Sequence, residues 1–247
     1  MAREGRFVHE NLNRRVAEYL REEILWSGRL KTGQHIQEME IAEHLNISRA
    51  PVREALRELE QQGLVKFLPR RGTYVAKFDH DDFLEIVDIR CMIESRVFET
   101  IITQRKLAIE DFKRLREMVG EMVVLAMGPS DDEQKITNFS ERDIMFHRYI
   151  WEKSGRKWSF KILTDMYYQL RLAMMQDMIM EQDMKVSAEM HYGIIDCLEN
   201  NDLEGARKNL LCHIFTLRRE PFRKEEMNDL LKDQHFGDLL NEGTDAG

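Results

Sequence analysis

The spacing of apolar residues between residues 79 and 220 is the feature that most constrains the fold, because it is helical throughout. No stretch there alternates polar and apolar residues as a half-buried strand does, and no glycine-rich phosphate loop occurs. Short polar connections separate the helical segments, and short connections make successive helices antiparallel neighbours. The pattern therefore predicts an antiparallel, all-α helix bundle. Its six helices are expected over residues 83–106, 109–127, 131–153, 157–180, 185–200 and 203–220.

The first third of the chain follows a different pattern. A helix is expected over residues 11–27 and a shorter one over 37–45. A tight turn at Asn46 then leads into a third helix with Ser48 as its N-cap and Gly63 as the residue that ends it. Residues 64–76 then suit a two-stranded hairpin. Three helices and a hairpin in this order predict a winged helix-turn-helix, whose third helix enters a major groove of DNA.

Positive charge is concentrated on this predicted head. Arg49, Arg53 and Arg57 recur every four residues on a face of the third helix that is separate from its apolar face. Such a stripe alone is typical of a solvated helix surface. The hairpin region, however, holds four basic residues and no acidic ones, and phosphates or a minor groove are its natural partners. These residues are Lys66, Arg70, Arg71 and Lys77.

The charge of the 247-residue chain changes sign near residue 78. The net charge is −8, but residues 1–77 carry 14 Lys and Arg against 11 Asp and Glu, a net of +3. The remainder carries 23 against 34, a net of −11. This asymmetry predicts two domains with different partners. We expect a DNA-binding domain over residues 1–78, a helical domain over 79–222, and an extension over 223–247 with room for one more helix.

Composition indicates a cytoplasmic protein with no membrane partner. The longest apolar run, Met122 to Met127, is far shorter than the roughly 18 residues that a membrane span needs, and the opening MAREGRF has no apolar segment. The three cysteines lack CxxC spacing, which favours reduced thiols over a disulfide framework.

Four side chains of the acidic part have a spacing that metal ligands require. Asp143 and His147 lie four residues apart on one predicted helix and therefore share a face. His191 and His213 lie equally far from the turn at Asp202, about 15 Å along each helix, so antiparallel packing brings them level. This counting does not bring the two pairs together. A core histidine satisfied by hydrogen bonds remains an alternative for each.

Two stretches resemble known families. Residues 27–76, SGRLKTGQHIQEMEIAEHLNISRAPVREALRELEQQGLVKFLPRRGTYVA, resemble the DNA-binding domain of the GntR family of bacterial transcription regulators. Farther on, DIMFH is similar to the D-x-x-F-H signature of the FCD effector-binding domain, which is found in the FadR subfamily. The segment MHYGIIDCLENNDLEGARKNLLCHI is similar to the end of that domain.

For the head, the resemblance implies a residue-level interface with DNA. Arg49 would read a guanine through a bidentate contact, and Arg53 would contact a base or a phosphate. Gly72 matches a glycine that lets the hairpin approach the minor groove. Met39 stands where some relatives carry an arginine. The implied DNA-binding residues are Ser48, Arg49, Ala50, Arg53, Arg70, Arg71 and Gly72.

For the helical domain, the resemblance implies a divalent metal held by Asp143, His147, His191 and His213. Three nitrogens and one oxygen suit zinc, nickel or manganese and leave positions open for another ligand. A small organic acid is the expected effector, because a buried cation attracts carboxylates. Arg90 matches the R-x-x-[LI]-E pattern of the family and would contact that acid, although a salt bridge with Glu94 is an alternative. Arg171 is a second candidate for the same role.

These features together predict a homodimeric transcription regulator that binds an operator and responds to a metal and a small carboxylate. A DNA-binding dimer with a vestigial metal site is one alternative. A DNA-tethered metallohydrolase is another, but nothing between Asp143 and His147 resembles the general-base glutamate of HExxH, and no other catalytic pattern is present. We therefore expect no enzyme activity.

Overall fold

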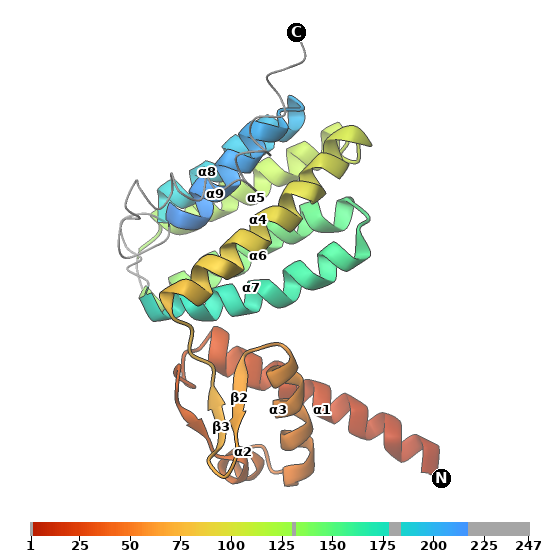
Figure 1. Ribbon diagram of the computed structural model, residues 1–247, viewed down its shortest axis with the longest axis vertical. Helices are drawn as coiled ribbons and strands as arrows, with labels where there is room; N and C mark the ends of the chain where they lie inside the picture. Colours follow the sequence, from red (N-terminus) through yellow and green to blue (C-terminus); the bar gives the residue numbers. More distant parts are fainter. Residues whose placement is uncertain (1, 130–131, 178–183, 217–247) are drawn as a thin grey trace. The chain divides into compact units, whose positions relative to one another are not determined.

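The computed structural model describes residues 2–129, 132–177 and 184–216 and divides the chain into two compact units (Figure 1). Unit 1 comprises Met1–Phe83 and Asp165–Gln176, and unit 2 comprises Leu84–Thr164 and Asp177–Gly247. Over the described ranges the chain forms nine helices and three short strands. The predicted fold class, a mainly helical protein with a winged head and a helix bundle, is confirmed.

Unit 1 has the predicted order of helices and hairpin, with one additional strand. The strand β1 has two residues, too few for a periodic signal in the sequence, and it completes an antiparallel sheet of order β1-β3-β2. His35 of β1 pairs with Tyr74 of β3. The elements are α1 (Ala2–Leu25), β1 (His35–Ile36), α2 (Glu38–His44), α3 (Arg49–Gln61), β2 (Val65–Leu68) and β3 (Gly72–Val75).

Backbone turns between these elements follow the expected chemistry. Asn46, between α2 and α3, has a φ of +52°, which asparagine tolerates better than most residues. Gly63 follows Gln62, the C-cap of α3, and has a φ of +72°, as the predicted helix end requires. Ser48 has the extended backbone of an N-cap, but its hydroxyl makes no capping hydrogen bond.

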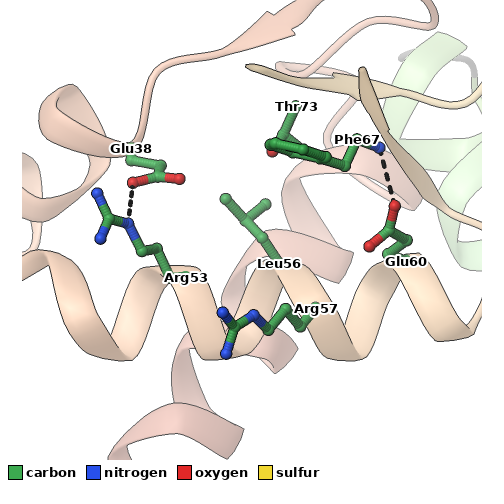
Figure 2. A pocket seen from close by; sticks show the side chains of 7 residues that line it. All are labelled: Glu38, Arg53, Leu56, Arg57, Glu60, Phe67 and Thr73. Carbon is green, nitrogen blue, oxygen red and sulfur yellow. Dashed lines mark hydrogen bonds and ion pairs between the residues drawn. The ribbon is translucent and has the colours of Figure 1, made fainter. Parts of the chain in front are cut away.

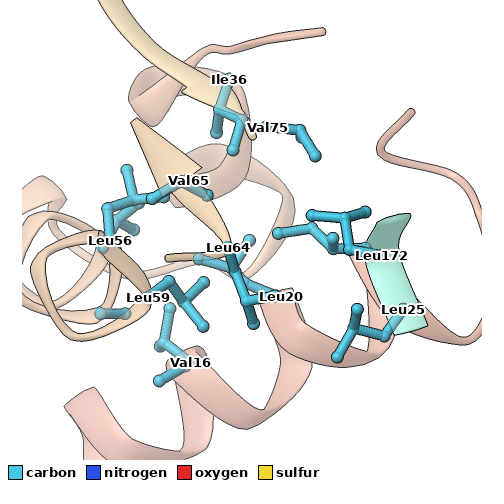
Figure 3. Close-up of a cluster of buried hydrophobic side chains, with 14 of the residues drawn as sticks. Val16, Leu20, Leu25, Ile36, Leu56, Leu59, Leu64, Val65, Val75 and Leu172 are labelled. Atoms are coloured by element: carbon cyan, nitrogen blue, oxygen red, sulfur yellow. The ribbon is translucent and has the colours of Figure 1, made fainter. Parts of the chain in front are cut away.

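The core of unit 1 includes a side chain from far along the sequence. Leu20 of α1, Leu59 of α3 and Leu64 before β2 are fully buried together. Leu172 of α7 (Lys157–Asp177) belongs to the same cluster and is 1% exposed (Figure 3). Because α7 passes from unit 2 into unit 1 within one helix, a segment after residue 164 completes the core of the head.

The same part of α7 satisfies the ends of two helices. Gln169 donates from its side-chain amide to the carbonyl of Gln62, the C-cap of α3, at 3.0 Å. Arg171 Nε donates to the carbonyl of Leu25, the last residue of α1, at 2.7 Å, and its guanidinium lies 3.7 Å from the centre of the Trp26 ring. Carbonyls at a helix C-terminus lack intrahelical partners and attract cations. Residues 165–176 therefore stabilise α1 and α3 as well as their core.

Unit 2 is the predicted helix bundle. Helix α5 packs against α6 and α8, and α8 packs against α9, as Figure 1 also shows. Residues 178–180, 217–220 and the helix expected within 223–247 lie outside the described residues. No described helix is long and apolar enough to cross a membrane. The remaining elements are α4 (His80–Thr103), α5 (Ile109–Met127), α6 (Asp132–Lys153), α8 (Met184–Glu199) and α9 (Leu203–Thr216).

Candidate metal centre and nucleic-acid interface

Asp143, His147, His191 and His213 converge in the interior of unit 2. The first two come from α6, His191 comes from α8 and His213 from α9, and all four are buried. One potential ligand atom of each lies within 4.8 Å of those of the other three. Asp143 Oδ1 lies 3.3 Å from Nε2 of His191 and 3.1 Å from Nε2 of His213. The imidazoles of His191 and His213 are level, with ring centres 4.0 Å apart.

Outer contacts orient the three imidazoles. His191 Nδ1 lies 3.0 Å from the carbonyl of Ser187, to which it donates. The hydroxyl of the same serine lies 3.4 Å from Nδ1 of His213. Glu94 Oε2 lies 3.3 Å from Nδ1 of His147. Partners at Nδ1 of His191 and His213 fix these two rings and leave Nε2 for a metal, which is the usual second layer around metal-binding histidines. The contact of Glu94 with His147 is close but lacks hydrogen-bonding geometry.

Several inward-facing atoms of this cluster lack hydrogen bonds. Asp143 Oδ1, His147 Nε2 and His191 Nε2 are buried without a partner of hydrogen-bonding geometry. An unsatisfied buried polar group costs about 1–3 kcal/mol, and three in one cluster are rare in a stable core. A divalent cation would satisfy all of them, and three nitrogens with one carboxylate oxygen suit zinc, nickel or manganese.

Protonation in the cluster matches what a metal site needs. Burial lowers the pKa of His213 to about 3, so that imidazole is neutral near pH 7. Burial also lowers the pKa of His147. Burial alone would raise the pKa of Asp143, but the imidazoles of His213 and His191 outweigh it and hold that pKa well below its ordinary value. Neutral imidazoles and an ionised carboxylate are the forms that bind metal.

Arg90 lies next to this cluster through Glu94. Both side chains come from α4 and are buried, and Arg90 Nε donates to Glu94 Oε1 at 2.5 Å. Burial would raise the pKa of Glu94, but Arg90 and His147 lower it to about 2, so the carboxyl is ionised. Arg90 Nη2 is buried without a hydrogen-bond partner. The contact of Glu94 with His147 was not predicted, because spacing on α4 gives no information about α6.

Arg171, the second predicted effector contact, belongs to unit 1. Its contacts with Leu25 and Trp26 are those of a helix cap, and its side chain is buried. Arg171 and Arg90 thus belong to different units, and the role of Arg171 toward an effector stays a prediction.

The predicted DNA-binding residues lie on the surface of unit 1. Ser48, Arg49 and Ala50 are exposed at the start of α3, and Arg53 and Arg57 follow on the same helix. Arg70 and Arg71 are exposed in the turn between β2 and β3. The apolar face of α3, including Leu56 and Leu59, is buried, so the helix presents its arginines outward.

Gly72 has a structural requirement that the sequence did not reveal. Its φ is +93°, and a Cβ at this position would come within 2.6 Å of His35 Nε2. His35 also packs on the Tyr74 ring, with centres 4.9 Å apart. The positive φ therefore favours glycine at this position, and the absent Cβ leaves room for the His35 ring beside the hairpin.

A hollow of about 440 Å³ lies between α2, α3 and the hairpin (Figure 2). At one end Glu38 accepts a hydrogen bond from Arg53, and at the other Glu60 accepts one from the backbone N–H of Phe67. Phe67 is 54% exposed, an unusual state for a large aromatic residue. The hollow is lined by Glu38, Arg53, Leu56, Arg57, Glu60, Phe67 and Thr73.

Comparison with known families finds two matches. Residues 12–75 match the family described as bacterial regulatory proteins, gntR family, and residues 85–216 match the FCD domain. The chain is 33% identical over 136 residues to the gluconate operon transcriptional repressor of Bacillus subtilis. The aligned region covers 55% of this chain and only 52% of that protein. It is 31% identical over 192 residues to a protein of Paenarthrobacter nicotinovorans named "Probable D-xylose utilization operon transcriptional repressor". This alignment covers 76% of this chain and 79% of that protein.

Solved structures with the same fold are also known. E. coli McbR/YncC has a TM-score of 0.68 at 20% identity and covers 89% of this chain and 96% of its own. A GntR regulator from a Rhodococcus species has a TM-score of 0.68 at 19% identity, and the match covers 89% of this chain and 97% of that one. At these identities the likeness concerns the fold alone.

Proposed function

The chain belongs to the GntR family of bacterial transcription regulators and carries an FCD domain, and from this premise we propose that it is a metal-dependent repressor whose unit 1 binds an operator. The observation that carries the sensing part is the convergence of four buried ligands with orphaned atoms at their centre. The exposed arginines of α3 carry the DNA-binding part.

On DNA, α3 enters the major groove with Arg49 reading a guanine and Arg53 contacting a base or a phosphate. Ser48 and Ala50 lie beside the backbone and base edges at the start of the helix. Arg70, Arg71 and Gly72 bring the hairpin to the adjacent minor groove, where positive charge is favourable. A homodimer would present two such heads to half-sites about one helical turn apart.

In unit 2, Asp143, His147, His191 and His213 would hold a divalent cation. Bound there, the cation supplies Lewis acidity and an attraction for carboxylates. Glu94, 3.3 Å from Nδ1 of His147, would hold that ring with Nε2 directed toward the ion.

Charge in this interior favours an anionic effector. The charges of Arg90 and Glu94 cancel, whereas one divalent cation with Asp143 leaves a net charge of +1. A single carboxylate would neutralise it, and a buried net charge is costly. The unsatisfied Nη2 of Arg90 is a donor that such an acid would use. The effector would act by binding two arrangements of the paired heads with different affinities.

DNA binding is tested by selection from a random duplex library with the purified full chain. The expected result is enrichment of one sequence with two half-sites. Binding to all duplexes alike would contradict sequence-specific regulation.

Metal analysis of the purified chain tests the sensing site and separates its alternatives. One equivalent of zinc, nickel or manganese is expected in the wild type and in His44→Ala, which removes an exposed histidine of α2, but not in His147→Ala. Absence of metal from the wild type at saturating concentration favours a DNA-binding dimer with a vestigial site. Hydrolysis of test esters or phosphates that is lost in His147→Ala would instead favour a metallohydrolase.

A further inference from the structure

We propose that Glu38 of α2 is a positioning residue for DNA recognition, which holds Arg49 and Arg53 of α3 in place and suppresses binding to non-cognate duplex. The inference rests on the proposed DNA-binding function and concerns a residue outside the predicted interface. The residues that carry it are Glu38, Arg49 and Arg53. Glu38 and Arg53 lie at one end of the hollow in Figure 2, and Arg49 donates to the same Glu38 carboxylate.

One carboxylate oxygen holds both arginines. Glu38 Oε2 accepts a hydrogen bond from Arg53 Nε at 2.7 Å and one from Arg49 Nη2 at 3.3 Å. The side chain of Glu38 is 24% exposed, whereas those of Arg49 and Arg53 are 54% and 52% exposed. The carboxylate of Glu38 is thus partly shielded from water, whereas the two guanidinium groups face the solvent. Partial shielding strengthens the Glu38–arginine ion pairs relative to fully exposed ones. The pKa of Glu38 is lowered, because the hydrogen bonds from Arg53 and Arg49 outweigh the opposing effect of burial.

The two arginines are held through different atoms. Glu38 contacts Arg53 through Nε, so both terminal nitrogens of Arg53 remain available as a fork for a phosphate or a base. It contacts Arg49 through Nη2, at a longer distance. A bidentate contact with guanine through both terminal nitrogens needs that atom. Arg53 is therefore presented to DNA ready to bind, and Arg49 must exchange Glu38 for its base.

This exchange creates selectivity. At a cognate guanine, Arg49 gains two hydrogen bonds for the one it gives up. At any other base the exchange has no such compensation, and the negative charge of Glu38 repels nearby phosphates. Glu38 should thus weaken binding to random DNA more than binding to the operator. Specificity of this kind depends on a penalty against wrong partners as well as contacts to the right one.

The variant Glu38→Gln tests the proposal, because it keeps the size and one acceptor oxygen but removes the charge. Fluorescence anisotropy measures its affinity for the duplex selected by the wild type and for a scrambled duplex of the same composition, between 50 and 200 mM salt. We expect tighter binding to the scrambled duplex, a salt slope steeper by up to about 0.9, and a specificity ratio reduced about tenfold, within the range that one base contact provides. Glu38→Asp keeps the negative charge and should therefore retain more of the wild-type specificity ratio than Glu38→Gln does.

Glu40→Gln is the matched control. It removes one negative charge from the same helix, where Glu40 is exposed and no described ion pair joins it to an arginine. Equal effects of Glu38→Gln and Glu40→Gln on the specificity ratio would overturn the proposal, since general charge removal would then explain both. Thermal unfolding of each variant establishes that the head is folded.

A second measurement does not need DNA. Nitrogen-detected or proton-detected NMR of the arginine side chains in the full chain should show slower solvent exchange for the Nε–H of Arg53 than for that of Arg57, which pairs with Glu54 through Nη1 instead. The difference should disappear in Glu38→Gln. Equal exchange in the wild type would overturn the proposal even if DNA binding is specific. A chain that enriches no duplex at all would overturn the proposed function, and this inference with it.

Discussion

The arginines of unit 1 and the histidines of unit 2 carry charge or potential charge in opposite environments. Arg49 and Arg53 lie at the surface and share an acceptor that water can reach. His147, His191 and His213 are closed off from water together with Asp143. Surface pairs are weak and exchange readily with a new partner, whereas buried polar groups are costly unless each one is satisfied. Under the proposed function, the surface arginines of the head would exchange Glu38 for DNA, whereas the buried cluster of the bundle would hold one ion.

The largest expected effect is the pH dependence of the buried site. In the unfolded chain a histidine binds a proton near pH 6.5, but in the folded chain the pKa of His213 is about 3. Between these pH values the unfolded state binds more protons than the folded state. The contribution of His213 to the free energy of unfolding is therefore fully present above pH 6.5 and is lost as the pH falls toward 3. The lowered pKa of Glu94 acts in the same direction below its ordinary range. Urea unfolding of the metal-free chain at pH 7 and pH 4 should differ by several kcal/mol.

Equal stability at the two pH values would show that the cluster is open to water in solution. Such a result would remove the contrast between the two units.

Metal should stabilise the bundle almost as strongly. Zinc at a thousand times its dissociation constant adds about 4 kcal/mol to the free energy of unfolding if it binds only the folded state. The gain is expected in the wild type and should be lost in His213→Ala. Calorimetry with and without zinc measures it. The same gain in His213→Ala would mean that the ion binds elsewhere.

The contribution of α7 to the head is tested with Leu172→Ala. Leu172 is buried in the core of unit 1, so its truncation should lower the free energy of unfolding by about 3 kcal/mol. Ile162→Ala, on the same helix at a position 43% exposed, should cost well under 1 kcal/mol. Comparable losses in denaturant unfolding of both variants would contradict the packing of residues 165–176 with the head.

Removal of the base-reading arginine should have a smaller and position-specific effect. Arg49→Ala is expected to cost about 2 kcal/mol of binding at one base position and to relax specificity there. Binding assays with every single-base variant of the selected duplex locate that position. Equal losses on operator and random DNA would contradict base readout by Arg49.

The smallest effect is expected in the hairpin. Arg70 is exposed in the turn between β2 and β3, so Arg70→Ala should weaken binding to all duplexes alike, by less than about 1 kcal/mol, and flatten the salt slope by about 0.9. A change in sequence preference would show that Arg70 contacts a base and would contradict the proposed contact with phosphate alone.

The sequence predicted those parts of the molecule that depend on local spacing. The arginines of α3, its end at Gly63 and the level placement of His191 and His213 all follow from periods and turn residues. Helix periodicity does not encode how one element packs against another. Spacing alone therefore did not bring the Asp143–His147 pair together with the His191–His213 pair. The family resemblance implied that the four residues form one site, and the structure shows that they converge. For the same physical reason the contacts of Glu94 with His147, of Glu38 with two arginines, and of Leu172 with the head were not predicted.

Anomalous diffraction from crystals of the full chain, recorded at the zinc, nickel and manganese edges, is the decisive experiment for the metal centre. We expect one anomalous peak within about 2.0–2.2 Å of Asp143 oxygen and of nitrogens of His147, His191 and His213. Imidazoles that hydrogen-bond only to one another, to Asp143 or to water, with no peak after growth in saturating metal, would contradict it.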